Sequence, residues 1–344
     1  MTITITKNTL SFPGHSFGES RNNYAFAIIK ADGSVVTWGN GAEGGDSSAV
    51  ATQLNGSVGV MQIFSTNTAF AALRTDGSVV TWGASSDGGD SNAVAAQLDG
   101  TVDVTQIFST ANAFAALRTD GSVVTWGNIT DGGNSSAVAA QLNGTVDVTQ
   151  IYSTGTAFAA LRTDGSVVTW GNSTHGGDSS AVAAQLNGTV DVTQISSTYD
   201  AFAALRSDGS VVTWGFGIYG GDSHTVAAQL DGTVDVVKII STTGAFAALR
   251  SDGSVVTWGY ASAGGDSSLV AAQLNGTVDV VSIYTTGSAF AALRTDGSII
   301  TWGSSTSGGD SSAVAGQLIS GVVGAANIAT NDVYINHAPT GTVS

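Results

Sequence analysis

Apolar and polar residues follow one another in blocks that repeat along the chain. Over residues 157–198, the apolar runs AFAALR, SVVTWG, AVAAQL and VDVTQI are separated by the turn TDGS, a loop and the turn NGT. Asp-Gly and Asn-Gly accept the positive φ of tight turns, so the runs that they join are predicted to be antiparallel strands. Each block therefore predicts four short strands. Several runs are apolar on both sides, which indicates sheets that are covered on both faces.

One unit recurs seven times with a period of 44 residues and no insertions. The tripeptide Asp-Gly-Ser first appears at Asp32 and last at Asp296, always at this spacing. The seven tryptophans follow the same period: Trp38, Trp82, Trp126, Trp170, Trp214, Trp258 and Trp302. Because they lie in the most constant strand, we expect them to pack the repeats together rather than to bind a ligand.

Units of about 40 to 50 residues with four strands, repeated four to eight times, are typical of β-propellers. We therefore predict an all-β fold: a seven-bladed β-propeller of four-stranded repeats over residues 1–332, with repeat cores from residue 25 and a C-terminal linker or tail over 333–344. The first unit lacks the strand that precedes the others, and residues 321–330 (GVVGAANIAT) fall on its register. The C-terminal strand is therefore expected to complete the first blade and close the ring.

The stretch AFAALRTDGSVVTWG, followed by a glycine-containing loop, resembles the repeat of the regulator of chromosome condensation family and its bacterial relatives. These relatives include the propeller-type β-lactamase inhibitory protein. The resemblance covers all seven units and implies a seven-bladed propeller, in agreement with the repeat count. The functions of the family's members range from nucleotide exchange on a small GTPase to enzyme inhibition, so the resemblance does not identify a function for this chain. The chain also lacks the basic character expected for docking to chromatin.

Charge and composition narrow the range of partners. The chain has 26 acidic and 10 basic residues, a net charge of −16. A nucleic-acid binder needs cations to displace the counterions of the phosphates, so DNA and RNA are not expected as partners. Membrane insertion is not expected either, since no stretch approaches the roughly 20 apolar residues of a membrane span. The absence of cysteine excludes disulfides and Cys-based metal or nucleophile sites.

Differences between the units concentrate in two windows. The four residues between Trp-Gly and Gly-Gly read, in order, NGAE, ASSD, NITD, NSTH, FGIY, YASA and SSTS. The dipeptide before Ala-Phe reads NY, NT, AN, GT, YD, TG and GS. The strand order puts both windows at one end of every blade, called here the upper end, and the two constant turns at the lower end. A constant scaffold thus presents a ring of varied short loops on one face.

The fifth unit carries the most distinctive upper loops. Drift under relaxed constraint is the alternative interpretation, since it would yield mostly Ser, Gly, Asn and Asp, and this composition describes several of the loops. The fifth unit instead gathers aromatic and aliphatic residues, which are typical of binding hot spots. The predicted partner-binding residues are Tyr199, Asp200, Phe216, Ile218, Tyr219, His224, Tyr260 and His175.

An arginine stands two residues before each Asp-Gly pair from the second unit on: Arg74, Arg118, Arg162, Arg206, Arg250 and Arg294. A ring of cations at the lower end could bind an anion. Pairing of each arginine with a nearby Asp or backbone carbonyl, as a structural contact that fixes the blade spacing, is the favoured interpretation.

The sequence gives little support for a metal site or for catalysis. The Gly-Gly-Asp carboxylates occur once per unit, too sparsely for calcium with its roughly six to eight oxygen ligands, and we expect them to cap the following Ser-Ser turn. The four histidines form no repeated His–carboxylate or Ser-His-Asp arrangement. His175 and His224 together would still lack a third metal ligand. We therefore predict no metal, no cofactor and no enzymatic activity.

The sequence favours a non-enzymatic interaction module that binds a protein or a glycan through its upper face. The alternatives are a proteinaceous enzyme inhibitor and a structural spacer within a large bacterial surface protein. The acidic, cysteine-free, Thr/Val/Gly-rich composition and the ending NHAPTGTVS indicate an extracellular or cell-surface bacterial protein. The propeller is then expected to be a monomeric module of a larger chain.

Overall fold

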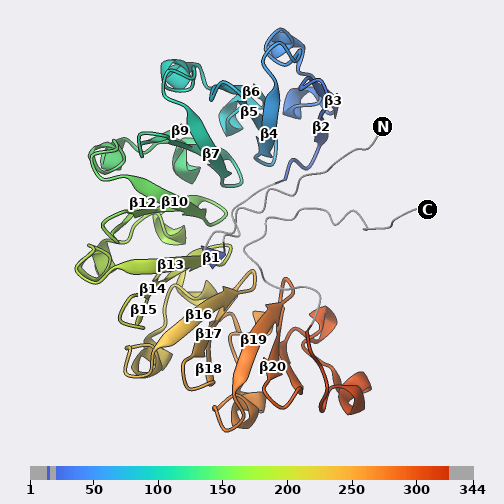
Figure 1. Ribbon diagram of the computed structural model, residues 1–344, viewed down its shortest axis with the longest axis vertical. Coiled ribbons are helices and arrows are strands. Elements are labelled where there is room, and N and C mark those ends of the chain that lie inside the picture. The colour runs from blue at the N-terminus through green and yellow to red at the C-terminus, as the bar shows by residue number, and fades with distance from the viewer. Residues whose placement is uncertain (1–13, 16–20, 325–344) are drawn as a thin grey trace.

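The structure, a computed structural model, describes residues 14–15 and 21–324. It contains seven sheets, one for each repeat, which lie side by side in an arc (Figure 1). Blades one to seven are formed by β2 (Ala25–Ile29) and β3 (Val35–Gly39); β4 (Val60–Ser65), β5 (Ala69–Arg74) and β6 (Val79–Gly83); β7 (Val104–Ser109), β8 (Ala113–Arg118) and β9 (Val123–Gly127); β10 (Val148–Ser153), β11 (Ala157–Arg162) and β12 (Val167–Gly171); β13 (Val192–Ser197), β14 (Ala201–Arg206) and β15 (Val211–Gly215); β16 (Val236–Ser241), β17 (Ala245–Arg250) and β18 (Val255–Gly259); and β19 (Val280–Thr285), β20 (Ala289–Arg294) and β21 (Ile299–Gly303). The short β1 (Gly14–His15) pairs in parallel with β13. The predicted all-β architecture of repeated sheets is confirmed.

In blades two to seven the middle strand is the AFAALR run, hydrogen-bonded to a strand on each side. Phe70 of β5 lies opposite Trp82 of β6, and the two rings stack with centroids 5.2 Å apart. The indole N–H of Trp82 donates to the carbonyl of Gly44 in blade one, at 3.0 Å. This Phe–Trp pair recurs in every blade. The six tryptophans of blades two to seven therefore pack each blade against the preceding one, as expected.

The prediction of a fourth strand in each unit is wrong, because the AVAAQL run forms a 3-10 helix. These helices are η2 (Ser48–Val50), η4 (Asn92–Gln97), η6 (Ser136–Gln141), η8 (Ser180–Gln185), η10 (His224–Gln229), η12 (Ser268–Gln273) and η14 (Ser312–Gln317). The side chain of Asp90 starts η4 by accepting the backbone N–H of Asn92, at 2.9 Å. Val94 and Leu98, four residues apart, turn toward the core while the alanines stay exposed. The spacing of the two large apolar residues thus fits a helix, and the exposed alanines rule out a covered strand.

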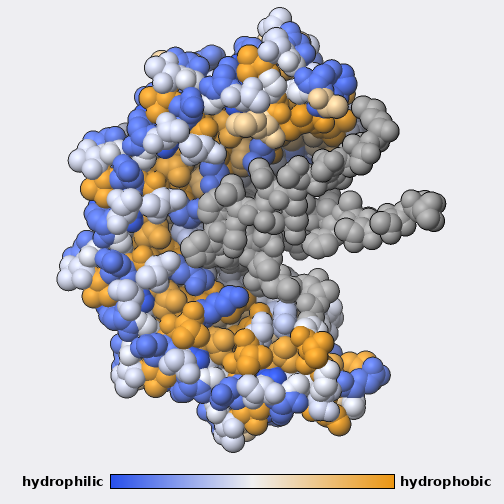
Figure 2. Space-filling view, viewed as in Figure 1, coloured by the Kyte–Doolittle hydropathy of each residue, from blue (hydrophilic) through white to orange (hydrophobic). Residues whose placement is uncertain are grey.

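Neighbouring blades share one apolar layer. Ala69, Ala71 and Leu73 of β5 pack against Ile107 and Phe114 of blade three, and equivalent layers lie between the blades that follow. The alanines of the middle strand leave room for the large rings of the next sheet, so the sheets interdigitate closely. Figure 2 shows apolar side chains along the inner side of the arc and at its two ends.

The lower end of each blade closes on a repeated set of polar contacts. In blade two, Oδ1 of Asp76 accepts the backbone N–H and the hydroxyl of Ser78, at 3.1 and 2.6 Å. Arg74 pairs with the other oxygen of Asp76 at 3.7 Å, and all six arginines make the equivalent pair. The predicted pairing is confirmed. Because both partners belong to one turn, the pair stabilises the turn itself rather than the spacing between blades.

Blade one differs from the others, because only β2 and β3 are described there. Residues 325–330, most of the segment expected to complete this blade, lie outside the described residues, as does the expected tail over 333–344. Phe26 and Trp38 of blade one are 63% and 47% exposed, whereas the other six tryptophans are at most 4% exposed. The arc therefore ends on an uncovered aromatic face.

Candidate functional site

The upper loops share one backbone although their side chains differ. In blade five the loop is η9 (Gly217–Tyr219), and the hydroxyl of Thr198 donates to the carbonyl of Tyr219 at 3.0 Å. Five other blades repeat this bond, from Thr66, Thr110, Thr154, Thr242 and Thr286. The corresponding helical turns are η3 (Ser85–Asp87), η5 (Ile129–Gly133), η7 (Ser173–His175), η11 (Ala261–Ala263) and η13 (Ser305–Ser307). In blade one, where the turn is η1 (Gly41–Glu43), the side-chain amide of Asn22 donates to the carbonyl of Glu43 instead, at 2.8 Å. In blades two to seven a constant threonine thus fixes the loop, and its side chains are free to vary.

The two variable windows meet at the upper end of the blades. Thr68 donates to Oδ2 of Asp87 at 2.7 Å in blade two, and the amide of Asn112 donates to Oδ2 of Asp131 at 2.8 Å in blade three. In blade four, Thr156 Oγ1 lies 3.0 Å from Nδ1 of His175. In blades two, three and four, the last residue of the loop and the second residue of the dipeptide therefore change together as hydrogen-bonding partners.

A continuous group of rings crosses the upper ends of blades four to six. The aromatic patch comprises these four rings, His175, Phe216, Tyr219 and Tyr260, together with the exposed ring of Tyr199 in blade five. The ring centroids of His175 and Phe216 are 5.9 Å apart in an edge-to-face arrangement, and Phe216 and Tyr219 are 5.7 Å apart. Tyr219 and Tyr260 are 5.6 Å apart. Tyr199, Phe216 and Tyr260 remain 38–49% exposed, so the patch offers aromatic surface to solvent.

Two glycines that were not predicted as site residues form the floor of the aromatic patch. A Cβ at Gly155 would lie 2.7 Å from Cζ of Tyr199, and a Cβ at Gly244 would lie 2.8 Å from Cδ1 of Tyr219. Both glycines occupy the variable dipeptide of the blade beside the ring that they support. The signal was present in the sequence, since the dipeptides next to the aromatic unit read GT and TG.

Asp200 is almost wholly buried beside the aromatic patch, 9% exposed. Its Oδ1 lies 3.2 Å from Nδ1 of His175, which also contacts Thr156. Burial raises the pKa of the Asp200 carboxyl, and the nearby His175 opposes this increase. Burial also raises the pKa of the Tyr199 hydroxyl, and the charge of Asp200 adds to that effect. His175 therefore joins blade four to blade five through a carboxyl that is costly to ionise.

The upper windows carry negative charge and no positive charge. The seven loops and seven dipeptides contain no Lys or Arg, and they contain four acidic residues: Glu43, Asp87, Asp131 and Asp200. Asp131 is near enough to Tyr199 to help raise the pKa of its hydroxyl. The aromatic patch therefore lies in a negative field that favours a positively charged partner.

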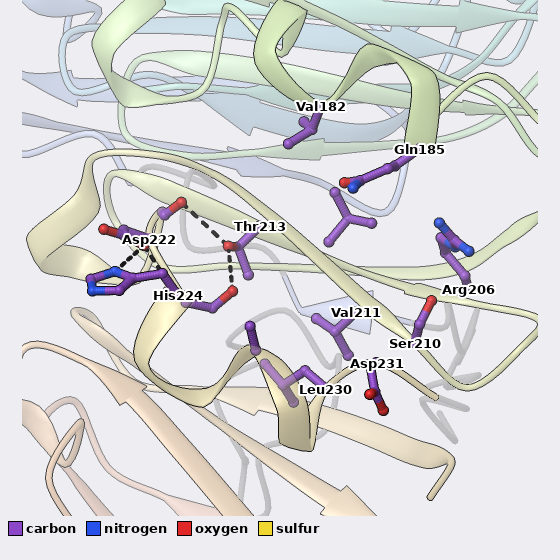
Figure 3. Close-up of a pocket in the computed structure, with 14 residues that line it drawn as sticks. Val182, Gln185, Arg206, Ser210, Val211, Thr213, Asp222, His224, Leu230 and Asp231 are labelled. Carbon is purple, nitrogen blue, oxygen red and sulfur yellow. Dashed lines mark hydrogen bonds and ion pairs between the residues drawn. The ribbon is translucent and has the colours of Figure 1, made fainter. Parts of the chain in front are cut away.

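Two predicted residues take no part in the ring contacts of the aromatic patch. Ile218, an aliphatic residue of η9, is 61% exposed. His224 begins η10, where Nδ1 lies 2.8 Å from Oδ1 of Asp222. Figure 3 shows this pair beside a groove of about 440 Å³ between blades four and five, with Val182 and Gln185 on one side. His224 therefore lines this groove, apart from the ring contacts of the aromatic patch.

The groove recurs between blades five and six, with a volume of about 530 Å³. Arg206 and Leu230 of the first groove are replaced by Arg250 and Leu274 of the second, each 44 residues further along the chain. The groove is thus a consequence of how neighbouring blades pack, and it does not distinguish blade five.

The Gly-Gly-Asp carboxylates cap the helices that follow them, as predicted. Asp46 accepts the backbone N–H of Ser48 at 2.8 Å, and this bond lowers the pKa of the Asp46 carboxyl. In blade three Asn134 makes the same bond to Ser136 at 2.9 Å, without a charge. Over residues 14–15 and 21–324, no three His, Cys, Asp or Glu side chains group as metal ligands would, and no helix is long and apolar enough to cross a membrane.

No protein-family model and no curated protein matches the sequence. Several solved structures are similar. The ectodomain of the Physcomitrella patens receptor kinase CR4 has 14% identity and a TM-score of 0.42, with 86% of this chain and 72% of that chain covered. The ectodomain of the Arabidopsis thaliana receptor kinase ACR4 has 14% identity and a TM-score of 0.39, with 82% of this chain and 93% of that chain covered. Prp20p from Saccharomyces cerevisiae has 15% identity and a TM-score of 0.39, over 71% of each chain.

Proposed function

We propose that this chain is a non-enzymatic interaction module that binds a protein through the aromatic patch. The observation that carries the proposal is the contact series His175–Phe216–Tyr219–Tyr260, which spans three blades at the variable end of the molecule. Partly exposed, mutually packed rings lose little side-chain entropy on binding and are typical of hot spots. Most other upper loops carry small polar residues, so the patch is a distinct surface on the rim.

The charge around the aromatic patch suggests the chemistry of the partner. Because the upper windows contain acids and no Lys or Arg, a basic protein surface would associate faster than an acidic one. An arginine or lysine of the partner could also lie over the ring of Phe216 or Tyr260. Plugging of an enzyme's active site is a special case of this proposal. The expected setting, outside a bacterial cell, rests on composition alone.

The test compares two variants with the unmodified chain in a screen of bacterial surface proteins and a glycan array. The first combines Tyr199→Ser, Phe216→Ser and Tyr219→Ser. The second, Ile129→Ser, removes an equally apolar side chain that is 70% exposed on the corresponding loop of blade three. We expect the triple variant to lose affinity for a protein partner by at least about 100-fold, as for removal of a hot spot, and the control to keep it.

Three outcomes would contradict the proposal. A partner that binds the triple variant unchanged would place recognition elsewhere on the molecule. Binding to the glycan array alone, lost in the triple variant, would make the ligand a sugar. Absence of any ligand would leave the structural spacer as the better function. Circular dichroism and melting temperatures of both variants establish that the fold is intact.

A further inference from the structure

One polar residue of each repeat is constant and exposed, yet its side chain has no partner in the fold. It is the glutamine before the last leucine of the AVAAQL run, and it occurs in every unit: Gln53, Gln97, Gln141, Gln185, Gln229, Gln273 and Gln317. All seven are exposed, and none of their side chains forms a hydrogen bond within residues 21–324. The residue before it varies, as Thr52 in the first unit and Gly316 in the seventh. The glutamine is therefore retained where its neighbour changes.

Other constant polar side chains have partners. In blade three, Asp120 accepts the backbone N–H of Ser122 at 3.1 Å, and Arg118 donates to the hydroxyl of Ser122 at 2.8 Å. The hydroxyl of Thr110 fixes the upper loop by donating to the carbonyl of Asp131, at 2.9 Å. A glutamine amide offers two N–H donors and a carbonyl acceptor. Since the fold uses none of these groups, they are available to a ligand.

The glutamines lie at the grooves between neighbouring blades. Gln185 lines the groove between blades four and five, and Gln229 lines the groove between blades five and six. Figure 3 shows Gln185 on the blade-four side of the first groove, with Arg206 and Asp231 of blade five across from it. The volumes of about 440 and 530 Å³ lie in the range of about 300–1,000 Å³ that is usual for small-ligand sites. Each groove is therefore large enough for a small ligand.

The charged side chains of both grooves are engaged within the fold. Each groove is lined by one arginine and two aspartates: Arg206, Asp222 and Asp231 in the first, and Arg250, Asp252 and Asp266 in the second. Both arginines pair with an aspartate of their own turn. Asp222, Asp231 and Asp266 accept backbone N–H groups at 2.8–2.9 Å. The grooves thus carry no net positive charge, and the uncommitted group that they share is a neutral amide.

Apolar side chains form another part of each groove. Val182, Val211 and Leu230 line the first, and Val226, Val255 and Leu274 take their places in the second. A sugar ring fits this combination, because it presents C–H groups on its face and hydroxyls at its edge, and each hydroxyl donates and accepts as an amide does. An anionic ligand would instead meet two carboxylates and no unpaired cation.

We propose that these grooves form a repeated site for a neutral saccharide, one sugar unit in each groove, separate from the aromatic patch. The glutamine amide bonds to sugar hydroxyls, and the valines and the leucine contact the C–H face of the ring. The same set of a glutamine, an arginine and a second-turn Asn or Asp recurs at three further junctions: Gln53, Arg74 and Asp99; Gln97, Arg118 and Asn143; and Gln141, Arg162 and Asn187. A polysaccharide of identical units can therefore occupy several grooves at once, with a combined affinity above that of one groove.

The first experiment presents the purified chain to a glycan array that holds neutral and acidic oligosaccharides. The test variant replaces five glutamines: Gln53→Ala, Gln97→Ala, Gln141→Ala, Gln185→Ala and Gln229→Ala. Alanine is the best helix former, so the helices should be kept. The matched control replaces the preceding residue at the same five places, which are exposed and line neither groove: Thr52→Ser, Ala96→Ser, Ala140→Ser, Ala184→Ser and Ala228→Ser.

The proposal predicts binding to neutral glycans that is at least about tenfold weaker in the glutamine variant and unchanged in the serine control. Binding to acidic glycans alone, binding to no glycan, or equal binding by the glutamine variant would overturn it.

The triple variant of the aromatic patch separates this proposal from the proposed function. We expect that variant to keep its glycan binding, and a glycan that it loses would place the sugar at the patch instead. A protein partner that is lost in the glutamine variant and kept in the triple variant would show that the grooves hold a peptide. The two variants therefore test the grooves and the patch independently.

Titration calorimetry with the smallest oligosaccharide that the array selects counts the sites. The proposal predicts more than one site per chain, since five junctions carry the set of side chains. Gln185→Ala combined with Gln229→Ala should lower the number of sites by two. One site in the unmodified chain, or an unchanged number in the double variant, would overturn recognition by these grooves.

Discussion

At the lower end of blades two to seven, the same Arg, Asp and Ser close every turn, whereas at the upper end the side chains change from blade to blade on one backbone. The lower contacts are side chain to side chain, so the identity of each residue matters. The upper loops are fixed by a threonine hydroxyl and by glycines, which act on backbone atoms. The difference shows how one repeat combines a rigid turn with a replaceable surface.

The largest effect on stability is expected where the constant frame of an upper loop is changed. Gly176 has φ of 103° and lies under the ring of Phe202, so Gly176→Ala is both strained and overpacked. We expect it to lower the free energy of unfolding by about 3 kcal/mol. His175→Ser, one residue earlier in the same loop, should cost less than about 1 kcal/mol. Urea denaturation of both variants measures the two values. Equal losses would contradict the distinction between the constant backbone of the upper loop and its variable side chains.

A smaller loss is expected from the lower turn. Asp120→Ala removes the acceptor of Ser122 and the partner of Arg118 in blade three. Since hydrogen bonds to charged groups contribute about 1.5–3 kcal/mol and this turn is partly exposed, we expect a loss of about 1–2 kcal/mol. Asp131→Ala, in the upper loop of the same blade, removes one hydrogen bond from Asn112 and should cost less than half as much. The denaturation midpoints of the two variants show whether the lower turn contributes more to stability than the upper loop.

Acid should weaken the turns at the lower end of the blades. The pKa of Asp208 is lowered to about 2, because hydrogen bonds from Arg206 and Ser210 outweigh its burial. Its lower-turn equivalents, such as Asp252, are shifted in the same direction. A lowered folded-state pKa means that the stabilisation is present above about pH 4 and is lost as the pH falls toward 2. Melting temperatures between pH 5 and 2 should fall, and a flat profile would contradict the role of these carboxylates.

The smallest expected effect is a gain in stability at the upper end. Because the folded-state pKa of Asp200 is raised, its contribution is present at low pH and is lost as the pH rises through that pKa. Asp200→Asn should therefore raise the melting temperature at pH 7 and leave it almost unchanged at pH 3. His175→Ser should do the reverse at pH 7, since it removes the nearby imidazole. A lower melting temperature for Asp200→Asn at pH 7 would show that the carboxylate stabilises the fold.

The period of 44 and the Asp-Gly turns were sufficient to predict the number of blades and the strands of AFAALR and VVTWG, because these features are local. AVAAQL was assigned wrongly, since a short apolar run fits a strand or a helix and only the positions of Val94 and Leu98 distinguish them. The two windows were correctly expected to meet, but the burial of Asp200 and the supporting role of Gly155 depend on the neighbouring blade. Contacts between blades join residues about 44 positions apart and leave no pattern within one unit, although the glycines of the dipeptides GT and TG beside the aromatic unit were a signal.

At the upper end, the backbone N–H of the first dipeptide residue donates to the carbonyl of the equivalent residue in the next blade, as from Asn67 to Ala111 and from Tyr199 to Thr243, both at 2.9 Å. These main-chain bonds have a consequence for how such a molecule changes over generations. They involve no side chain, so a dipeptide and its loop can be copied from one repeat to another without disturbing the link between blades. Gene conversion between the nearly identical repeats would perform this copying in frame. New combinations of neighbours around the rim could then arise from loops that already fold, without waiting for individual substitutions.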